Sequence, residues 1–133
     1  MIDRINPTQL FDGTVFSMSQ ASHITAAGLV FISGQVAWDR QGTVQGQTHV
    51  EQAQVALENL RTALDAAGSN VEQLVQLRIY LRGECADVSA ELAAPLIAFL
   101  NGTRPSMTLI GVASLATPDT LVEIEAIATV NAR

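Results

Sequence analysis

Apolar residues recur at spacings of three and four along one segment in the middle of the chain. This stripe consists of Val50, Ala53, Leu57, Leu60, Leu64 and Ala67 and would lie on one face of an amphipathic helix. Thr48 and Glu51 form a T-x-x-E capping box at its start, and Gly68 supplies a left-handed cap at its end. The pattern predicts a helix over about 49 to 67.

Two β-prone runs precede this helix, Ser22 to Thr25 and Leu29 to Ser33, joined by Ala26-Ala27-Gly28. They predict a hairpin. The second run is apolar on both faces, as an interior strand would be, and Gly34 ends it where another backbone or a ligand approaches closely.

A period of two begins after the helix, at Leu74. The alternation predicts a half-buried strand. Its inward residues are Val75, Leu77, Ile79 and Leu81, and its outward residues are Gln76, Arg78, Tyr80 and Arg82.

Helical spacing returns through Val88, Leu92, Leu96 and Phe99 and is closed by Asn101-Gly102. Pro95 is expected to bend this second helix. Two last strands follow, at about 106 to 113 and 121 to 130. The order ββ-α-β-α-ββ predicts an α+β fold with both helices on one face of a mixed sheet. Because the other face of the sheet needs a cover, we expect a homo-oligomer.

The last strand carries two glutamates in an otherwise apolar run. Alternation places Glu123, Glu125, Ile127 and Thr129 on one face and Val122, Ile124, Ala126, Ala128 and Val130 on the other. Both carboxylates could simply face water. Alternatively, one of them lies in a partly dry cleft, where it could hold or deprotonate a water molecule.

Composition narrows the classes of function. The chain has 133 residues, the length of one domain spanning 1-133, with 48% hydrophobic and 15% charged residues. No apolar run is long enough for a membrane helix, and no targeting segment is visible, so we expect a cytoplasmic protein. A net charge of -6 without a basic cluster argues against nucleic acid as a partner. Cys85 is the sole cysteine, and His23 and His49 lie far apart, so we predict no metal site.

Several motifs together resemble the RidA/YjgF family of enamine/imine deaminases. They are "SQA" at Ser19 to Ala21, "ISGQ" at Ile32 to Gln35, the capped helix from Gln52 to Gly68, and "RPSMTLIGVASLATPDTLVEIEAIA" from Arg104 to Ala128. The resemblance implies a chorismate-mutase-like fold, and a homotrimer with ligand clefts between adjacent subunits. It also implies hydrolysis of reactive imines without a cofactor. Some relatives are labelled endoribonucleases, which the acidic balance of this chain does not favour.

The family pattern assigns roles to particular positions. The water-orienting glutamate falls on Glu123, and the serine of the SGQ motif falls on Ser33. Three polar positions are replaced: Met107 stands where the family has a carboxylate-clamping arginine, Met18 replaces a tyrosine, and the family asparagine maps near Ala93.

Loss of the arginine removes a charge-assisted bidentate clamp, a change that commonly costs about 2 to 5 kcal/mol of binding free energy. We therefore predict a hydrolase for a small enamine or imine other than the standard amino-acid-derived ones. Glu123 would be the base, Ser33 and Met18 would contact the substrate, and the main chain beside Met107 and Leu109 would line the cleft.

Some alternatives stay open at this stage. Arg78, Arg82 or Arg104 could replace the missing arginine, and Met18 and Met107 could be ordinary core residues. The same fold could also serve as a non-catalytic trimer that binds a small molecule or a protein segment.

Overall fold

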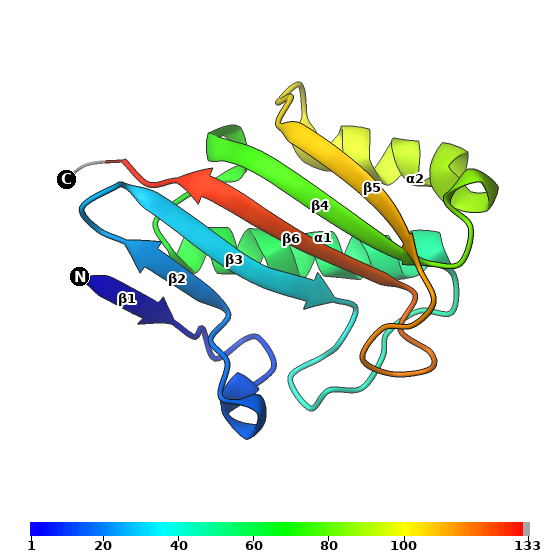
Figure 1. The fold of residues 1–133 in the computed structure, drawn as a ribbon, viewed down its shortest axis with the longest axis horizontal. Coiled ribbons are helices and arrows are strands. Elements are labelled where there is room, and N and C mark those ends of the chain that lie inside the picture. Colours follow the sequence, from blue (N-terminus) through cyan, green and yellow to red (C-terminus); the bar gives the residue numbers. More distant parts are fainter. Residues whose placement is uncertain (132–133) are drawn as a thin grey trace.

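The computed structural model describes residues 1–131 and contains one six-stranded sheet with two helices behind it (Figure 1). The strands are β1 (Ile2–Ile5), β2 (Ala21–Ile24), β3 (Leu29–Val36), β4 (Leu74–Arg82), β5 (Ser106–Val112) and β6 (Val122–Thr129), and the helices are α1 (His49–Ala66) and α2 (Cys85–Leu100). The spatial order of the strands is β1-β2-β3-β6-β4-β5, and only β4 and β5 run parallel among these neighbours. The predicted mixed α+β sheet with both helices on one face is confirmed.

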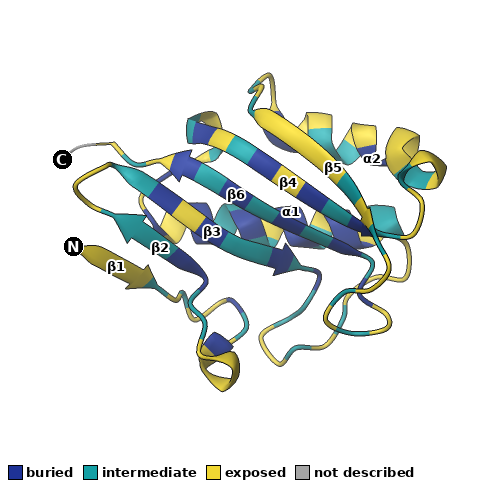
Figure 2. Ribbon diagram, viewed as in Figure 1, coloured by how far each residue is buried: buried dark blue, intermediate teal, exposed yellow. Residues whose placement is uncertain are grey.

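Helix α1 forms as its spacing predicts. The Thr48 hydroxyl accepts a hydrogen bond from the Glu51 amide at 3.1 Å, and Gly68 has a φ of +76°, in the left-handed region. The Glu51 carboxylate accepts a bond from the amide of Gln47, at 2.7 Å, where a regular capping box would use Thr48. The stripe from Ala53 to Ala67 is buried against β3 and β6, as Figure 2 shows.

The sequence patterns missed or misplaced two features. Strand β1 was not predicted, since its four residues are mostly exposed and carry no periodic signal. Val75 was assigned to the buried face, but a bulge between Leu74 and Gln76 leaves it 44% exposed and buries Leu74 instead.

Strand β3 does not end at Gly34 but continues to Val36 through a bulge. Between the pairs Ile32–Ala126 and Gln35–Ile124, two residues of β3 oppose only one residue of β6. The extra residue inverts the alternation, so Gln35 faces the helices and Val36 faces the open side of the sheet.

Candidate functional site

Glu123 lies on the open face of β6, the face away from the helices. It pairs with Val36 of β3 on one side and with Tyr80 of β4 on the other. Its carboxyl group packs over Gly34: a Cβ at that position would lie 2.7 Å from the Glu123 carboxyl carbon and closer still to Oε1. The group that approaches Gly34 is therefore the Glu123 side chain, where the sequence had predicted another backbone or a ligand.

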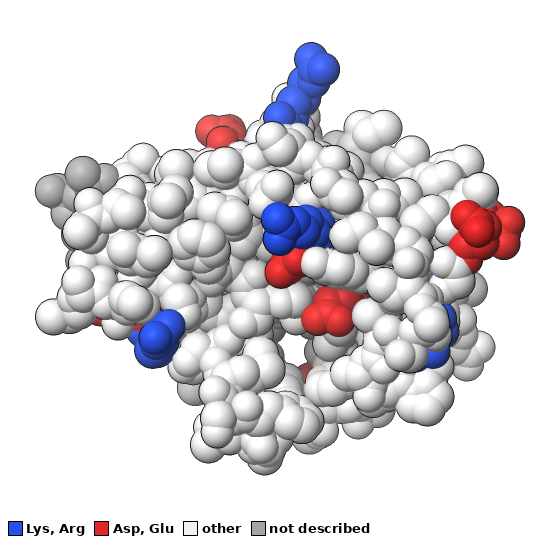
Figure 3. Space-filling view, in the orientation of Figure 1, with Lys and Arg blue, Asp and Glu red and all other residues white. Residues whose placement is uncertain are grey.

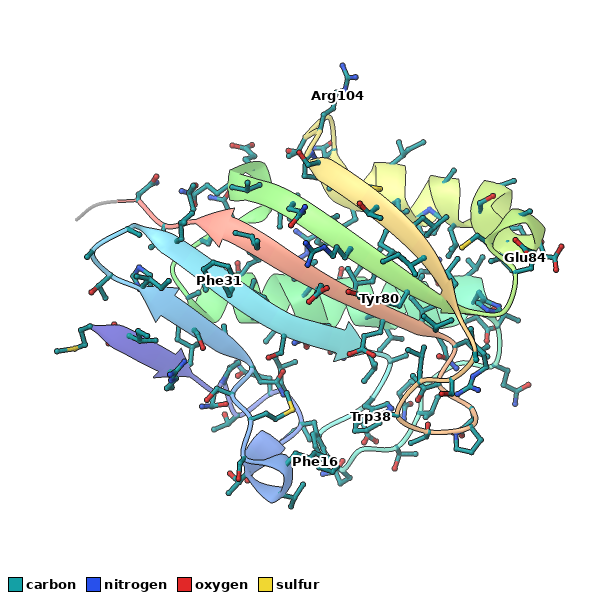
Figure 4. All side chains as sticks on the ribbon, viewed as in Figure 1. Phe16, Phe31, Trp38, Tyr80, Glu84 and Arg104 are labelled. Atoms are coloured by element: carbon teal, nitrogen blue, oxygen red, sulfur yellow. The ribbon has the colours of Figure 1, made fainter. Side chains whose placement is uncertain are left out.

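The Glu123 carboxylate opens into a pocket of about 170 Å³. We call this the Glu123 pocket; its lining includes Phe11, Phe16, Met18, Trp38, Asn59 and Glu123. Figure 3 shows acidic side chains beside a hollow in the open face of the molecule, and in Figure 4 Phe16 and Trp38 lie at the same end of the sheet. The walls are mainly aromatic and thioether groups and the remaining polar lining is neutral amides, so the carboxylate is the charged group of a mainly apolar site.

The aromatic wall comes from a short 3₁₀ helix, Gly13–Phe16, from Phe11 just before it, and from Trp38 just after β3. Asp12 caps that helix by accepting a hydrogen bond from the Thr14 amide at 2.9 Å. The ring centroids of Phe11 and Trp38 are 5.2 Å apart in an edge-to-face arrangement, and those of Phe11 and Phe16 are 6.2 Å apart. These contacts hold three rings around one side of the pocket.

A chain of side-chain amides fixes the floor of the pocket. Gln35 Nε2 donates to Gln20 Oε1 at 2.9 Å, and Gln20 Nε2 donates to the carbonyl of Phe11 at 2.7 Å. Asn59 Nδ2 of α1 donates to the carbonyls of Val36 and Trp38, at 2.9 and 3.1 Å. The amides thereby tie the segment before β2, strand β3 and helix α1 into one frame.

Burial raises the pKa of Glu123 above its ordinary value, and the nearby Glu125 carboxylate raises it further. Glu125 itself is held outside the pocket by Arg78, with an N–O distance of 3.6 Å, and by the Tyr80 hydroxyl. The hydrogen bond to Glu125 raises the pKa of Tyr80. A carboxylate with a raised pKa beside an apolar cavity is suited to accept a proton.

The structure brings Glu123 and Met18 together in the pocket. Ser33 lies in the bulge beside Gly34, where its hydroxyl donates to the carbonyl of Ser19 at 2.7 Å, and it is not a lining residue. Met107 and Leu109 lie on β5, with β4 between them and β6, and are 44% and 37% exposed. Within one chain these two residues are remote from Glu123, and their contact with a ligand stays a prediction that needs a second subunit.

The three candidate arginines are occupied or distant in the single chain. Arg78 pairs with Glu125, and Arg82 donates to the carbonyls of Ala113, Thr117 and Thr120, which ties down the loop before β6. Arg104 is exposed and projects from the start of β5 (Figure 4). No lysine or arginine of residues 1–131 lines the Glu123 pocket.

Sequence reasoning did not assign a role to Phe11, Phe16, Trp38 or Asn59. Gln20 and Gln35 stood in the quoted motifs, but nothing in their spacing shows that they bond to each other across β2 and β3. Asn59 lies in the α1 helix beside the apolar stripe, and its polar type at that place is the one signal that could have revealed it.

Other classes of site are not seen in the described part of the chain. Residues 1–131 contain no group of three His, Cys, Asp or Glu side chains placed to hold a metal ion. Neither helix within that range is both long and apolar enough to cross a membrane.

A family model described as Endoribonuclease L-PSP matches residues 15–130. A RutC family protein of Synechocystis is 36% identical over 107 residues, which cover 79% of this chain and 81% of that protein. The chain belongs to the RidA/YjgF family. A crystal structure of RidA from an Antarctic Psychrobacter is 26% identical, covers 96% of this chain and 99% of its own, and has a TM-score of 0.85.

The family also includes proteins from other compartments. The mitochondrial protein mmf2 of Schizosaccharomyces pombe is 36% identical over 77 residues, 58% of this chain and 57% of that protein. Family membership therefore does not fix the compartment, and the cytoplasm stays a prediction for this chain. The predicted RidA/YjgF fold is confirmed by the close superposition on the family's solved structures.

Proposed function

We propose that the protein is a hydrolase of the enamine/imine deaminase type, acting on a small imine that carries no carboxylate. One observation supports this proposal above the others: the Glu123 carboxylate opens into a mainly apolar pocket that no basic side chain of residues 1–131 lines. An anionic substrate would meet the like charge of Glu123 there without a compensating cation. A neutral or protonated imine would not be repelled by Glu123.

The chemistry needs a water molecule, an electrophilic carbon and a base. Water adds to the carbon of the protonated imine while Glu123 accepts a proton from it, which forms a carbinolamine. Return of that proton to nitrogen expels ammonia, so that R₂C=NH₂⁺ and H₂O become R₂C=O and NH₄⁺. No step of this hydrolysis calls for a cofactor.

The assembly is also part of the proposal. The open face exposes apolar side chains, among them Ile2, Phe31 and Val75, and β5 is the last strand of the sheet, so one edge of its main chain is unpaired. A homotrimer that covers this face and this edge could bring the main chain beside Met107 and Leu109 of one subunit toward the Glu123 pocket of the next. Sedimentation velocity tests this directly, because a monomer at micromolar concentration would contradict it.

The activity test compares two imines that share a phenyl ring. Amine oxidase acting on benzylamine releases an imine without a carboxylate, and amino-acid oxidase acting on phenylalanine releases one with it. We expect the protein to accelerate loss of the first imine over buffer and Glu123→Gln to lower that acceleration by about a hundredfold or more, whereas Glu91→Gln, an exposed change on α2, keeps it. If neither imine nor other small imines are hydrolysed faster than in buffer, the protein is a binding module of the same fold.

A further inference from the structure

We propose that the Glu123 pocket selects a cation built on one six-membered ring, an aryl or cyclic iminium whose N–H groups point at Glu123. The inference deepens the proposed function, since it names the charge and shape of the substrate. It rests on three features of the pocket: which hydrogen-bonding groups remain free, what the walls are made of, and how large the space is.

The free hydrogen-bonding groups are mainly acceptors. The Trp38 indole donates to Thr120, and the amides of Asn59 and Gln35 each donate to two acceptors. Gln20 Nε2 donates once, to the carbonyl of Phe11. By contrast, no hydrogen bond from residues 1–131 reaches the Glu123 carboxylate or Asn59 Oδ1. Every fully buried side-chain oxygen in that range has a hydrogen-bond partner, so the unpartnered oxygens of Glu123 and Asn59 must be accessible to solvent or to a ligand. A site whose free charged group is an acceptor, and whose donors are mostly bonded within the protein, is complementary to a ligand that donates.

The walls favour a flat cation. The faces and edges of Phe11, Phe16 and Trp38 surround the space next to the carboxylate, and Met18 adds a polarisable thioether. Aromatic faces attract cations through the ring quadrupole, and rings stack on rings. A carboxylate at one end and aromatic groups around it thus recognise a ligand that is both planar and positively charged.

The volume of the pocket within one chain matches about one ring. An apolar cavity of about 150 Å³ holds a benzene molecule, and the Glu123 pocket measures about 170 Å³. One six-membered ring with a one-carbon substituent would fill it. Two fused rings with substituents would extend into the opening beside Phe16, which is 65% exposed.

The test uses benzamidinium, a stable planar cation that carries the N–H groups of an aryl iminium. Benzamide is its neutral counterpart, and benzoate is the anion of nearly the same shape. Binding to the full-length protein is measured by titration calorimetry, and quenching of Trp38, the sole tryptophan, reports that the ligand is in the pocket. We expect benzamidinium to bind about ten- to a hundredfold more tightly than benzamide, and benzoate to bind least.

Two variants locate the effect. Glu123→Gln should remove the preference for benzamidinium over benzamide, whereas Glu91→Gln, with the same change of net charge on an exposed position of α2, should keep it. Phe16→Ala should weaken the binding of benzamidinium and benzamide alike, because it shortens the aromatic wall and leaves the carboxylate in place. Phe16 is 65% exposed, so this substitution should not disturb folding.

The outcomes separate this inference from the proposed function. The inference is overturned if benzoate binds as tightly as benzamidinium, or if the preference for benzamidinium over benzamide survives in Glu123→Gln. Either result counts against it even if an imine is hydrolysed. Selective binding of benzamidinium with no hydrolysis of any imine supports the inference and refutes the proposed function.

Discussion

Gly34→Ala is the sharpest test of how the pocket positions its base. A Cβ on residue 34 would lie 2.7 Å from the Glu123 carboxyl carbon, whereas ordinary contacts of a Cβ begin at 3.4 Å. The carboxyl carbon must therefore retreat by about 0.7 Å, and Oε1 by more. Misplacing a catalytic group by about 1 Å costs on the order of a hundredfold in rate. We expect kcat/KM for imine hydrolysis to fall about ten- to a hundredfold, equivalent to about 1.4 to 2.7 kcal/mol in the activation barrier.

Stability should change little in the same variant. The atoms that the new methyl group meets belong to the end of a flexible side chain, and Gly34 does not have the positive φ that would strain an alanine. Its thermal unfolding midpoint is expected to stay within about 3 °C of the parent. A large fall in that midpoint would mean that the backbone, and not the carboxylate, had moved.

A double-mutant cycle decides whether the effect passes through Glu123. In the Glu123→Gln background, where the base is already lost, Gly34→Ala should lower the remaining rate by less than about threefold. The assay is loss of the imine released from benzylamine, corrected for buffer. If the two substitutions lower the rate additively, residue 34 acts on something other than Glu123, and the reasoning is wrong.

Three further predictions concern charge and packing. Glu125→Gln removes one of the two causes that raise the pKa of Glu123, so the acidic limb of the pH–rate profile, where the base becomes protonated, should move to lower pH. Glu123→Gln should raise the free energy of unfolding at neutral pH, measured by urea denaturation. The pKa of Glu123 is higher in the folded state than in the unfolded state, so its contribution to stability is fully present below the unfolded-state pKa and is lost as pH rises through the folded-state pKa. Glutamine does not ionise, so the variant does not suffer this loss at neutral pH. Leu60→Ala, at a fully buried position of α1, should cost about 2 to 5 kcal/mol of that free energy with little change in ligand selectivity.

The fold could be predicted largely because two periodicities were clean. The α1 stripe and the strict alternation of β6 each bury one face, and the structure confirms both. Strand β1 was not predicted because its pairing with β2 depends on main-chain hydrogen bonds, and these leave no pattern in side-chain type. The predicted burial of Val75 was wrong because a bulge shifts the alternation by one residue, and nothing in the sequence marks where that residue is inserted.

The site was predictable only in part, for a related reason. Glu123 could be proposed from its place in the strand, but its neighbours Phe16, Trp38 and Asn59 come from three different segments. Their proximity depends on tertiary packing, which spacing along the chain does not encode. Met18 was found through the family resemblance, not through a pattern of its own.

The two faces of β6 separate stability from function in this protein. Residues such as Ile124 and Ala126 face the helices and are buried in the core, so changes there should act on folding. Glu123 and Glu125 face the open side, where the core does not need them and where burial works against the charge of Glu123. A charged group kept in an apolar pocket at a cost in stability is best explained by what it does to a ligand. The same alternation that builds the sheet therefore marks the positions where substitutions should change activity while the fold persists.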